Sequence, residues 1–473
     1  MKTKSSSLKN IPTRSASFNE DTYKNPFFHT SDNFEESQKL LDNGISTEDP
    51  TQMTKCQDSA SMGGSGSVTT LSDSVTERDA RFTYQEELDS AARIVEKLSK
   101  ETKFFDGIRE NSFPRFTWEE LELGLLLGRG GFCTVHEIRD LSMLPSFRQK
   151  YPELRYDDEE IERKFMMDRC LRSGDARYAV KKLYVKPEVD RRIYSRGHVD
   201  LALEVKFLAV FDHPNIVKLR AVCDQPSCTE NYFIIMDRLY DTLETRLVRW
   251  KREFHKAKSV KKKLIGGTFK MTDEKSIKRF LVAHDICQAV NHLHSNSIIY
   301  RDLKPENIGF DVRDDVKIFD FGLAKELRTS EALEDGTYRL TEMTGSLRYM
   351  APEVASYKTY NLSADVYSYG ILLWQIISME VPFNKFNSQL HREHVVKRGH
   401  RPEIPEKWPV TWNGLLRLCW AQNYRKRPTI PEVLDELRAN LYVLQGGDDS
   451  CLNVTRRTNK SASGLEKLVL FQK

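Results

Sequence analysis

The feature that most constrains this chain is the run I-Y-R-D-L-K-P-E-N at residues 299–307. It places a carboxylate (Asp302), an ammonium group (Lys304) and a carboxamide (Asn307) within one short segment. Such a set can accept a proton from an alcohol, neutralise a phosphoryl oxygen and help to hold a divalent metal. A second carboxylate, Asp320, stands shortly afterwards in the sequence Asp-Phe-Gly. Together the two segments indicate metal-assisted phosphoryl transfer.

Composition indicates a chain that is folded in part. The 473 residues are 39% hydrophobic and 30% charged, so we expect long polar segments beside a normal core. The formal net charge of +4 is too small to indicate nucleic acid as the main partner. No apolar run reaches the ~18 residues of a membrane span, so none is expected.

The cysteines indicate a reducing compartment. Eight are scattered along the chain without a C-x-x-C pair, which predicts free thiols. A disulfide between Cys223 and Cys228 is the alternative. We therefore expect a cytoplasmic protein, with the nucleus as an alternative location.

The two ends of the chain differ from its middle. Residues 1–83 are rich in Ser and Thr and are predicted to be disordered, and residues 446–473 are predicted to form a flexible tail. Residues 84–110 are predicted to be an amphipathic helix and linker, since apolar residues recur there at three- and four-residue spacing. This helix is expected to pack on the folded domain, with packing on a partner as the alternative.

Two inserts interrupt the middle of the chain. The first spans about residues 139–177, and its acidic run at 157–160 predicts a helix, because acids in a first turn complement the helix dipole. The second spans about residues 250–271 and is strongly basic. We interpret it as a solvated loop; a docking surface for an acidic partner and a nuclear address are the alternatives.

A glycine-rich turn is predicted between two strands at residues 128–135, G-R-G-G-F-C-T-V. Its glycines would let backbone N–H groups approach phosphate oxygens without an intervening side chain. Cys133 stands where a third glycine of G-x-G-x-x-G is expected. A tight hairpin without a ligand is the alternative. The residues assigned to nucleotide binding here are Gly128, Arg129, Gly130, Gly131, Phe132 and Val135.

A strand at residues 178–183 carries the candidate phosphate-binding lysine, Lys181. Neighbouring side chains on a strand point to opposite faces, so only one of Lys181 and Lys182 can face a cleft. Ala179 shares the face of Lys181 and fits the small residue that lines an adenine pocket. Glu204 lies in a helical segment, and taken alone it is interpreted as a surface glutamate.

Taken in order, these segments resemble a eukaryotic protein kinase over about residues 121–441. The resemblance implies an α+β, bilobal protein kinase fold, with a small antiparallel β-sheet N-lobe plus one helix and a larger α-helical C-lobe. It implies that ATP and Mg²⁺ bind in the crevice between them. One departure is Tyr300, which stands where the family has the histidine of H-R-D.

The resemblance also implies roles for individual residues. Asp302, Lys304, Lys181 and Glu204 are expected to be catalytic, and Asn307 and Asp320 to be metal ligands. Met236, Asp237 and Leu239 are expected to line the adenine edge. Further expectations concern a buried Glu353–Arg427 ion pair, Asp365 as the anchor of the catalytic loop, Arg301 as a phosphate receiver, and switch hydroxyls on Ser330, Thr337, Tyr338, Thr341 and Thr344.

The subgroup follows from smaller signals. Lys304 and Ser346 resemble serine/threonine kinases, while T-G-S-L-R-Y-M-A-P-E at 344–353 resembles the tyrosine-kinase-like group. We predict a kinase of that group that phosphorylates Ser or Thr of proteins, in intracellular signalling. One alternative is a pseudokinase that binds nucleotide or acts as a scaffold, favoured by Cys133 and Tyr300. Another is an unrelated phosphohydrolase that uses water as acceptor.

Overall fold

The computed structural model describes residues 77–102, 104–130, 132–144, 156–184, 191–264 and 274–444. The chain divides into two units, residues 1–68 and 69–473, and every described residue belongs to the second. The segment before residue 77 and the predicted tail at 446–473 lie outside the described residues.

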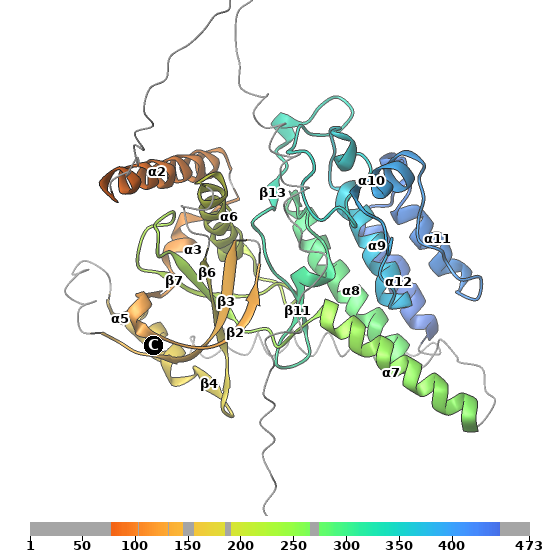
Figure 1. Ribbon diagram of the computed structural model, residues 1–473, viewed down its shortest axis with the longest axis horizontal. Helices are drawn as coiled ribbons and strands as arrows, with labels where there is room; N and C mark the ends of the chain where they lie inside the picture. The colour runs from red at the N-terminus through yellow and green to blue at the C-terminus, as the bar shows by residue number, and fades with distance from the viewer. Residues whose placement is uncertain are drawn as a thin grey trace, which may run out of the picture. The chain divides into compact units, whose positions relative to one another are not determined.

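One lobe is built on a six-stranded sheet with the strand order β1-β7-β8-β6-β3-β2 (Figure 1). Its neighbours are antiparallel except that β1 runs parallel to β7. The central β8 is buried on both faces, as its apolar sequence predicts. The strands are β1 (Arg115–Phe116), β2 (Leu121–Arg129), β3 (Cys133–Leu141), β6 (Tyr178–Leu183), β7 (Leu219–Cys223) and β8 (Phe233–Asp237).

Helices pack on this sheet and on one another. Helix α6 (Arg191–Val210) packs against it, and α2 (Glu77–Glu101) lies across α6 (Figure 1). The predicted segment 84–110 is only partly this helix: α2 begins earlier, at Glu77, and ends at Glu101. The short α3 (Gly107–Asn111) forms near the end of that segment. The apolar spacing of α2 places Ala91 and Val95 on the face that meets α6.

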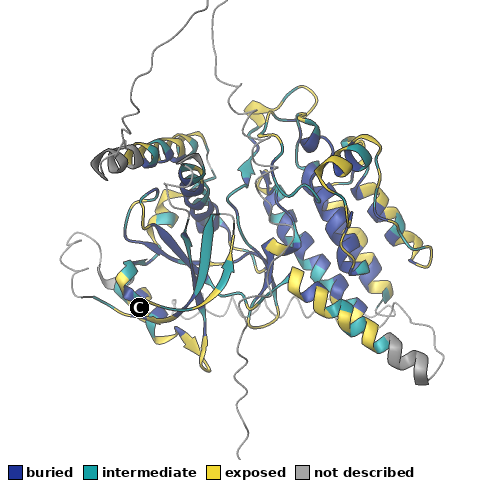
Figure 2. Ribbon diagram, viewed as in Figure 1, coloured by how far each residue is buried: buried dark blue, intermediate teal, exposed yellow. Residues whose placement is uncertain are grey.

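The second lobe is mainly helical. It contains α7 (Leu243–Leu264), α8 (Glu274–Ser295), α9 (Ser363–Ser378), α10 (Ser388–Leu390), α11 (Val410–Cys419) and α12 (Ile430–Leu444). Helix α9 is buried over almost its whole length (Figure 2) and packs with α8 and α11. Among the described residues, no helix has the length and apolar character needed to cross a bilayer.

Short strands form two further small sheets, one of three strands and one of two. They are β9 (Asp241–Thr242), β10 (Ile298–Ile299), β11 (Ile308–Phe310), β12 (Val316–Ile318) and β13 (Lys325–Glu326). Strand β11 pairs with β9 and β12, and β10 pairs with β13. Residues assigned to the active site lie beside these strands. Asp302 follows β10, Asn307 directly precedes β11, and Asp320 follows β12.

The first insert is partly ordered. Strand β3 continues to Leu141, past the predicted start of the insert at about residue 139, and α5 (Tyr156–Asp168) follows within the insert. A hairpin of β4 (Leu171–Arg172) and β5 (Asp175–Ala176) completes it. Arg163 of α5 forms a buried 2.7 Å ion pair with Glu120, which fixes the helix to the lobe.

The interpretation of the second insert as a solvated loop is wrong for most of its length. Helix α7 continues through its basic residues to Leu264. Lys, Arg, Glu and Ala are good helix formers, and no Gly or Pro interrupts this segment before Gly266.

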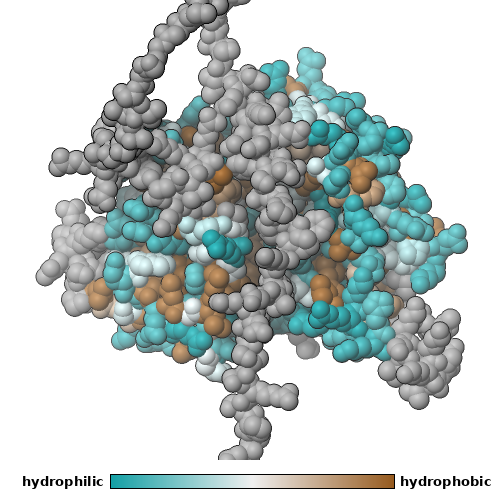
Figure 3. Space-filling model, viewed as in Figure 1, coloured by the Kyte–Doolittle hydropathy of each residue, from teal (hydrophilic) through white to brown (hydrophobic). Residues whose placement is uncertain are grey.

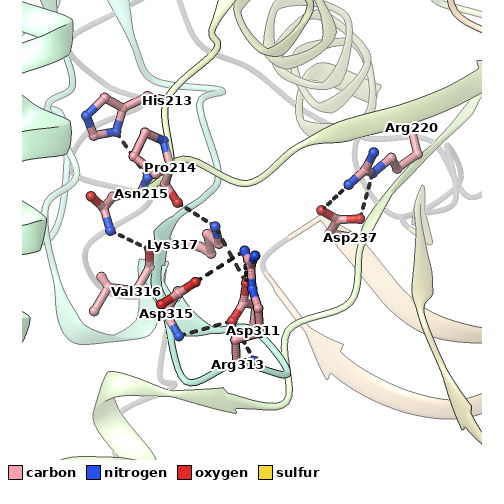
Figure 4. A network of polar contacts seen from close by, with 10 residues as sticks. All are labelled: His213, Pro214, Asn215, Arg220, Asp237, Asp311, Arg313, Asp315, Val316 and Lys317. Carbon is pink, nitrogen blue, oxygen red and sulfur yellow. Dashed lines mark hydrogen bonds and ion pairs between the residues drawn. The ribbon is translucent and has the colours of Figure 1, made fainter. Parts of the chain in front are cut away.

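The connection after α6 is fixed to the second lobe by a polar network (Figure 4). Asn215 donates a 3.1 Å hydrogen bond from its amide to the carbonyl of Val316, and Lys317 donates to the carbonyl of Pro214. Lys317 also lies 3.6 Å from Asp311. Because the buried Lys317 amine joins both sides, this connection ties the end of α6 to the β11–β12 hairpin.

The surface in Figure 3 is mostly hydrophilic, with apolar side chains gathered over the sheet-bearing lobe. The large exposed apolar residues of that lobe include Leu125 and Leu126 on β2 and Ile161 and Phe165 on α5. Arg169 covers the ring of Phe165 at 3.7 Å, so part of this apolar surface is shielded by a cation.

Candidate active site

Strand β6, helix α6 and the D-F-G segment converge on one amine. The Lys181 Nζ lies 2.6 Å from the Glu204 carboxylate and 3.0 Å from the Asp320 carboxylate. A Cβ added at Gly322 would lie 3.0 Å from the Cβ of Asp200, so α6 packs closely on this segment. The three groups that the sequence assigns to different elements therefore meet at one place.

The contacts of the two neighbouring lysines show which one faces the cluster. The Lys182 Nζ points away from Lys181, since it donates a 3.0 Å hydrogen bond to Asn231 and lies 4.2 Å from the ring centre of Trp118. Lys181 is thus the lysine on the inner face.

The charges of this cluster stabilise its ionised form. Burial alone would lower the pKa of Lys181, but the charges of Asp320 and Glu204 outweigh burial and raise that pKa well above its ordinary value. Burial opposes ionisation of Asp320 as well, yet Lys181 keeps the pKa of Asp320 below its usual value. At neutral pH Asp320 therefore carries a negative charge and can hold a cation.

The segment at 299–307 forms a second polar cluster. The Lys304 Nζ lies 2.7 Å from the Asp302 Oδ2, and the Asn307 amide donates to the same oxygen at 2.8 Å. The other oxygen, Oδ1, accepts hydrogen bonds from Ser346, at 3.0 Å from its hydroxyl and 3.1 Å from its backbone N–H. Both Asp302 oxygens are thus held in fixed directions.

Helix α9 anchors this segment. The buried Asp365 carboxylate accepts hydrogen bonds from the backbone N–H groups of Tyr300 (2.8 Å) and Arg301 (2.9 Å), and from His294 at 3.0 Å. Arg301 has a positive φ of 71°, an uncommon conformation for a non-glycine residue that these bonds maintain.

Tyr300 has a packing role in the place of the expected histidine. Its hydroxyl donates to the carbonyl of Phe319 at 2.5 Å, and its ring lies 5.3 Å from that of Phe321. The tyrosine thus connects the loop to the D-F-G segment.

The glycine-rich turn is placed beside this cluster by the pairing of β3 with β6, in which Val135 lies opposite Lys181. The Gly130 N–H donates to the carbonyl of Cys133 at 2.8 Å, and the Arg129 guanidinium stacks on Tyr184 at 4.0 Å. Gly131 lies outside the described residues. Neither the Gly130 N–H nor the Arg129 side chain is therefore directed at a ligand in this arrangement.

The residues assigned to the adenine edge lie on strand β8 or just after it. Met236 is buried and lies opposite Ala179 in the β6–β8 pairing. The Asp237 carboxylate instead forms a bidentate pair with Arg220 at 2.7 and 2.8 Å (Figure 4). The Asp237 backbone N–H also has a partner, the carbonyl of Lys218 at 3.0 Å. Leu239 packs against Gly309 of β11.

The expected switch hydroxyls differ in accessibility. Thr337 is fully buried and donates to Asp335 at 2.6 Å, and the buried Thr344 donates to the carbonyl of Thr341 at 2.9 Å. Tyr338 is half-buried and its backbone pairs with Tyr360. Thr341 and Ser330 are exposed.

A buried ion pair closes the activation segment. Arg427 binds both oxygens of Glu353 at 2.6 and 2.8 Å, and also donates to the carbonyls of Ser363 and Ala421. Such bidentate geometry is the most specific form of an Arg–carboxylate pair.

Comparison with known proteins decides the family. The family model for the protein kinase domain matches residues 167–437, more than half of the chain. The chain belongs to the protein kinase family. The match begins inside α5, so strands β2 and β3 of this kinase precede it, although β3 pairs with β6 in the matched region.

Curated relatives of this kinase include serine/threonine-protein kinases of the plant Arabidopsis thaliana. STY46 is 31% identical over 55% of this chain and 40% of its own length, and STY17 is 31% identical over 58% and 42%. A mitogen-activated protein kinase kinase kinase of Drosophila melanogaster is 28% identical over 68% of this chain and 23% of its own length. The chain thus spans less than half the length of these relatives. They support placement in the tyrosine-kinase-like group.

Two features of this kinase site were not expected from the sequence: the contact between Ser346 and Asp302, and the position of Asp200. The contact of Ser346 with Asp302 depends on Gly345, which has a φ of 95° and whose added Cβ would overlap the carbonyl oxygen of Arg301. The second is Asp200, one turn before Glu204 on α6. Burial raises the pKa of Asp200 to about 6, although Arg196 opposes the shift at 3.7 Å. The glycine before Ser346 was the available signal for the first; the sequence contains none for the second.

Proposed function

We propose that this chain is a protein serine/threonine kinase that transfers the γ-phosphoryl group of ATP to hydroxyl groups of a protein substrate. The observation that carries the proposal is the double cluster, Lys181 with Glu204 and Asp320, and Asp302 with Lys304 and Asn307. The relatives named as serine/threonine-protein kinases support it.

The donors around the site fit Mg²⁺. The ion prefers oxygen ligands and keeps several positions for phosphates and water, which a single carboxylate and a carboxamide leave open. Asp320 offers a half-exposed carboxylate. The Asn307 amide nitrogen is used by Asp302, so its oxygen remains available. When bound, Mg²⁺ would neutralise phosphate charge.

The protein groups then have separate tasks. Lys181, oriented by Glu204, binds the nucleotide phosphates as a point charge. Asp302 accepts the proton of the incoming alcohol and directs its oxygen, and Lys304 stabilises charge on the transferred group. Catalysis depends on positioning and electrostatics, because phosphoryl transfer needs little covalent chemistry from the protein.

The features that favoured a pseudokinase have structural explanations. Tyr300 is hydrogen-bonded and packed on Phe321. Burial raises the pKa of Cys133 to about 12, so its thiol stays neutral beside the phosphate-binding lysine. Neither residue removes a group that the proposed chemistry needs. The phosphohydrolase alternative has no observation in its favour.

The neighbouring lysines give a matched test of the proposal. Lys181→Met is expected to lower phosphoryl transfer from Mg-ATP to a generic protein acceptor roughly 30-fold or more, the equivalent of about 2 kcal/mol for one lost charge-assisted bond. Lys182→Met removes an equal charge from the opposite face and is expected to stay within twofold of wild type. Equal loss in both variants, or none in either, would contradict the assignment.

We further propose that Arg301 receives a phosphate on Thr341. The Arg301 Nη1 is buried and has no hydrogen-bond partner among the described residues. Thr341 is exposed, and its carbonyl accepts from the Tyr360 hydroxyl at 2.7 Å. Burial has the largest effect on the Tyr360 hydroxyl and raises its pKa. The nearby Arg301 charge acts in the opposite direction and lowers that pKa, which places Arg301 close to Tyr360. A phosphate at this place would satisfy the free guanidinium nitrogen.

Thr341→Ala is accordingly expected to lower the activity of fully phosphorylated kinase about tenfold, since a new charge-assisted bond contributes more than ~1.4 kcal/mol. Ser330→Ala, at another exposed hydroxyl, is the control and should have no effect. Mass spectrometry of active protein should find phosphate on Thr341. Full activity of Thr341→Ala would refute this role.

The proposals on location and partners rest on the cysteines and on helix α7. The described cysteines, Cys223 and Cys228 included, carry free thiols. This supports the proposal of a reducing compartment, the cytoplasm or nucleus. Helix α7 runs through the basic insert to Leu264, and we propose an acidic partner for this segment on the basis of its charge.

A further inference from the structure

Helix α2 covers the side of α6 that faces away from the sheet. Leu201 and Val205 of α6 belong to the main core, whereas Ala202 packs in a separate cluster with Ala91 and Val95 of α2. Ala91 has no exposed surface. Figures 1 and 2 show α2 lying across α6 with its buried side inward. Glu204 follows Ala202 by two residues, so α2 packs on the part of α6 that carries the partner of Lys181.

The C-terminal end of α2 contacts the start of the activation segment. The Arg328 guanidinium donates to the main-chain carbonyl of Glu101 at 2.7 Å and lies 3.4 Å from the Glu101 carboxylate. The Thr102 hydroxyl donates to the carboxylate of Glu326 in β13. Strand β13 pairs with β10, which leads directly into the catalytic loop. The same helix therefore contacts both α6 and the segment that follows Asp320.

A row of aromatic rings connects Phe104, three residues beyond the end of α2, to the active site. The ring of Phe104 lies 5.4 Å from that of Phe211, and Phe211 lies 5.1 Å from Phe321 of the D-F-G segment. Phe321 in turn lies 5.3 Å from Tyr300. Ring pairs at these separations attract one another beyond their burial, so the position of Phe104 favours one position of Phe321.

We propose that helix α2 and Phe104 are positioning elements of the kinase site, which hold α6 and Phe321 where Lys181, Glu204 and Asp320 meet. This proposal rests on the proposed kinase function. It extends the catalytic unit to residues before the family match at 167 and before the predicted domain start at 121. Helix α6 has two packed sides, so the loss of one would allow it to move away from Lys181.

Two neighbouring alanines of α2 provide the test in the full-length chain. Ala91 is buried against α6 and Ala92 is exposed. Ala91→Glu is expected to lower kcat at saturating ATP at least tenfold and to accelerate hydrogen–deuterium exchange of α6 amides. Ala92→Glu adds the same charge and should change neither. Phe104→Ala should also lower kcat. Phe104→Leu keeps a large apolar side chain, so its loss of kcat should be at most half of the loss in Phe104→Ala.

A second background separates positioning from general stability. If α2 acts through the Lys181–Glu204 contact, Ala91→Glu should change the residual activity of a Glu204→Gln protein by less than twofold, while it still lowers Tm. An equal fold-loss in both backgrounds would overturn the proposal. So would unchanged α6 exchange in Ala91→Glu.

The exchange measurement does not need turnover, so the two proposals can fail separately. Wild-type protein that transfers no phosphate would refute the proposed function. Faster α6 exchange in Ala91→Glu, with wild-type exchange in Ala92→Glu, would still establish that α2 holds α6.

Discussion

Asp302→Asn is expected to abolish almost all phosphoryl transfer, with kcat reduced by about 10³-fold or more. The amide keeps the size of the carboxylate but cannot accept the proton of the substrate hydroxyl. It also leaves one acceptor oxygen where two now serve Lys304, Asn307 and Ser346. Both the proton acceptor and the geometry of the loop are therefore affected, which makes this the largest change in activity that we predict.

The measurement is steady-state transfer of labelled phosphate from Mg-ATP to a basic protein acceptor, with nucleotide binding measured separately. Nucleotide affinity should stay within a few-fold of wild type, since Lys181 and Asp320 are unchanged. Asp435→Asn, on the surface of α12, removes an equal charge 3.0 Å from Arg438 and serves as the control. Transfer that survives in Asp302→Asn would remove this residue from the role of base.

The parts of the site that the sequence could predict are those set by local geometry. Asp302, Lys304 and Asn307 are close in sequence, so any turn that holds the segment brings their side chains together. Strand alternation required that only one of Lys181 and Lys182 face the cleft. The resemblance to a family indicated that this one is Lys181. Glu204 required more, since its 2.6 Å contact joins two elements; the resemblance to a family supplied it.

Other features depend on contacts that no local pattern encodes. The amphipathic spacing near residue 91 predicts a helix, but not that α6 is its partner or that Phe104 reaches Phe211. Thr337 carries a hydroxyl within the activation segment and was therefore predicted to be a switch residue. In the structure it is completely buried and donates to Asp335. Asp237 was assigned to the nucleotide edge, and the sequence does not show that its carboxylate pairs with Arg220 on the adjacent strand.

The second insert was assigned wrongly for a different reason, because a pattern that was present in the sequence was misinterpreted. Its basic residues indicated solvent exposure and were therefore interpreted as a loop, although exposure and helical structure are compatible. Lys251 on this helix forms a 2.6 Å ion pair with Glu380. Charge alone does not distinguish a solvated helix from a loop; the absence of Gly and Pro before Gly266 was the more informative signal.

The largest expected change in stability is that of Arg427→Ala. The Arg427 side chain is buried with Glu353, and its removal leaves an unpaired carboxylate and two main-chain carbonyls without their donor. Breaking a buried pair from one side costs about 3–5 kcal/mol, because the remaining charge cannot reach water. Urea unfolding of the purified kinase should show a loss of this size.

Arg425→Ala is the matched control, since Arg425 stands two residues earlier, is exposed, and lies 3.8 Å from Asp335. Its loss should change the unfolding free energy by less than ~0.5 kcal/mol, as for exposed ion pairs generally. A double variant, Glu353→Met with Arg427→Met, removes both charges together. If the cost of Arg427→Ala comes from the stranded carboxylate, this double variant should be more stable than Arg427→Ala. A double variant as unstable as the single one would instead assign the loss to the donors that Arg427 provides to Ser363 and Ala421.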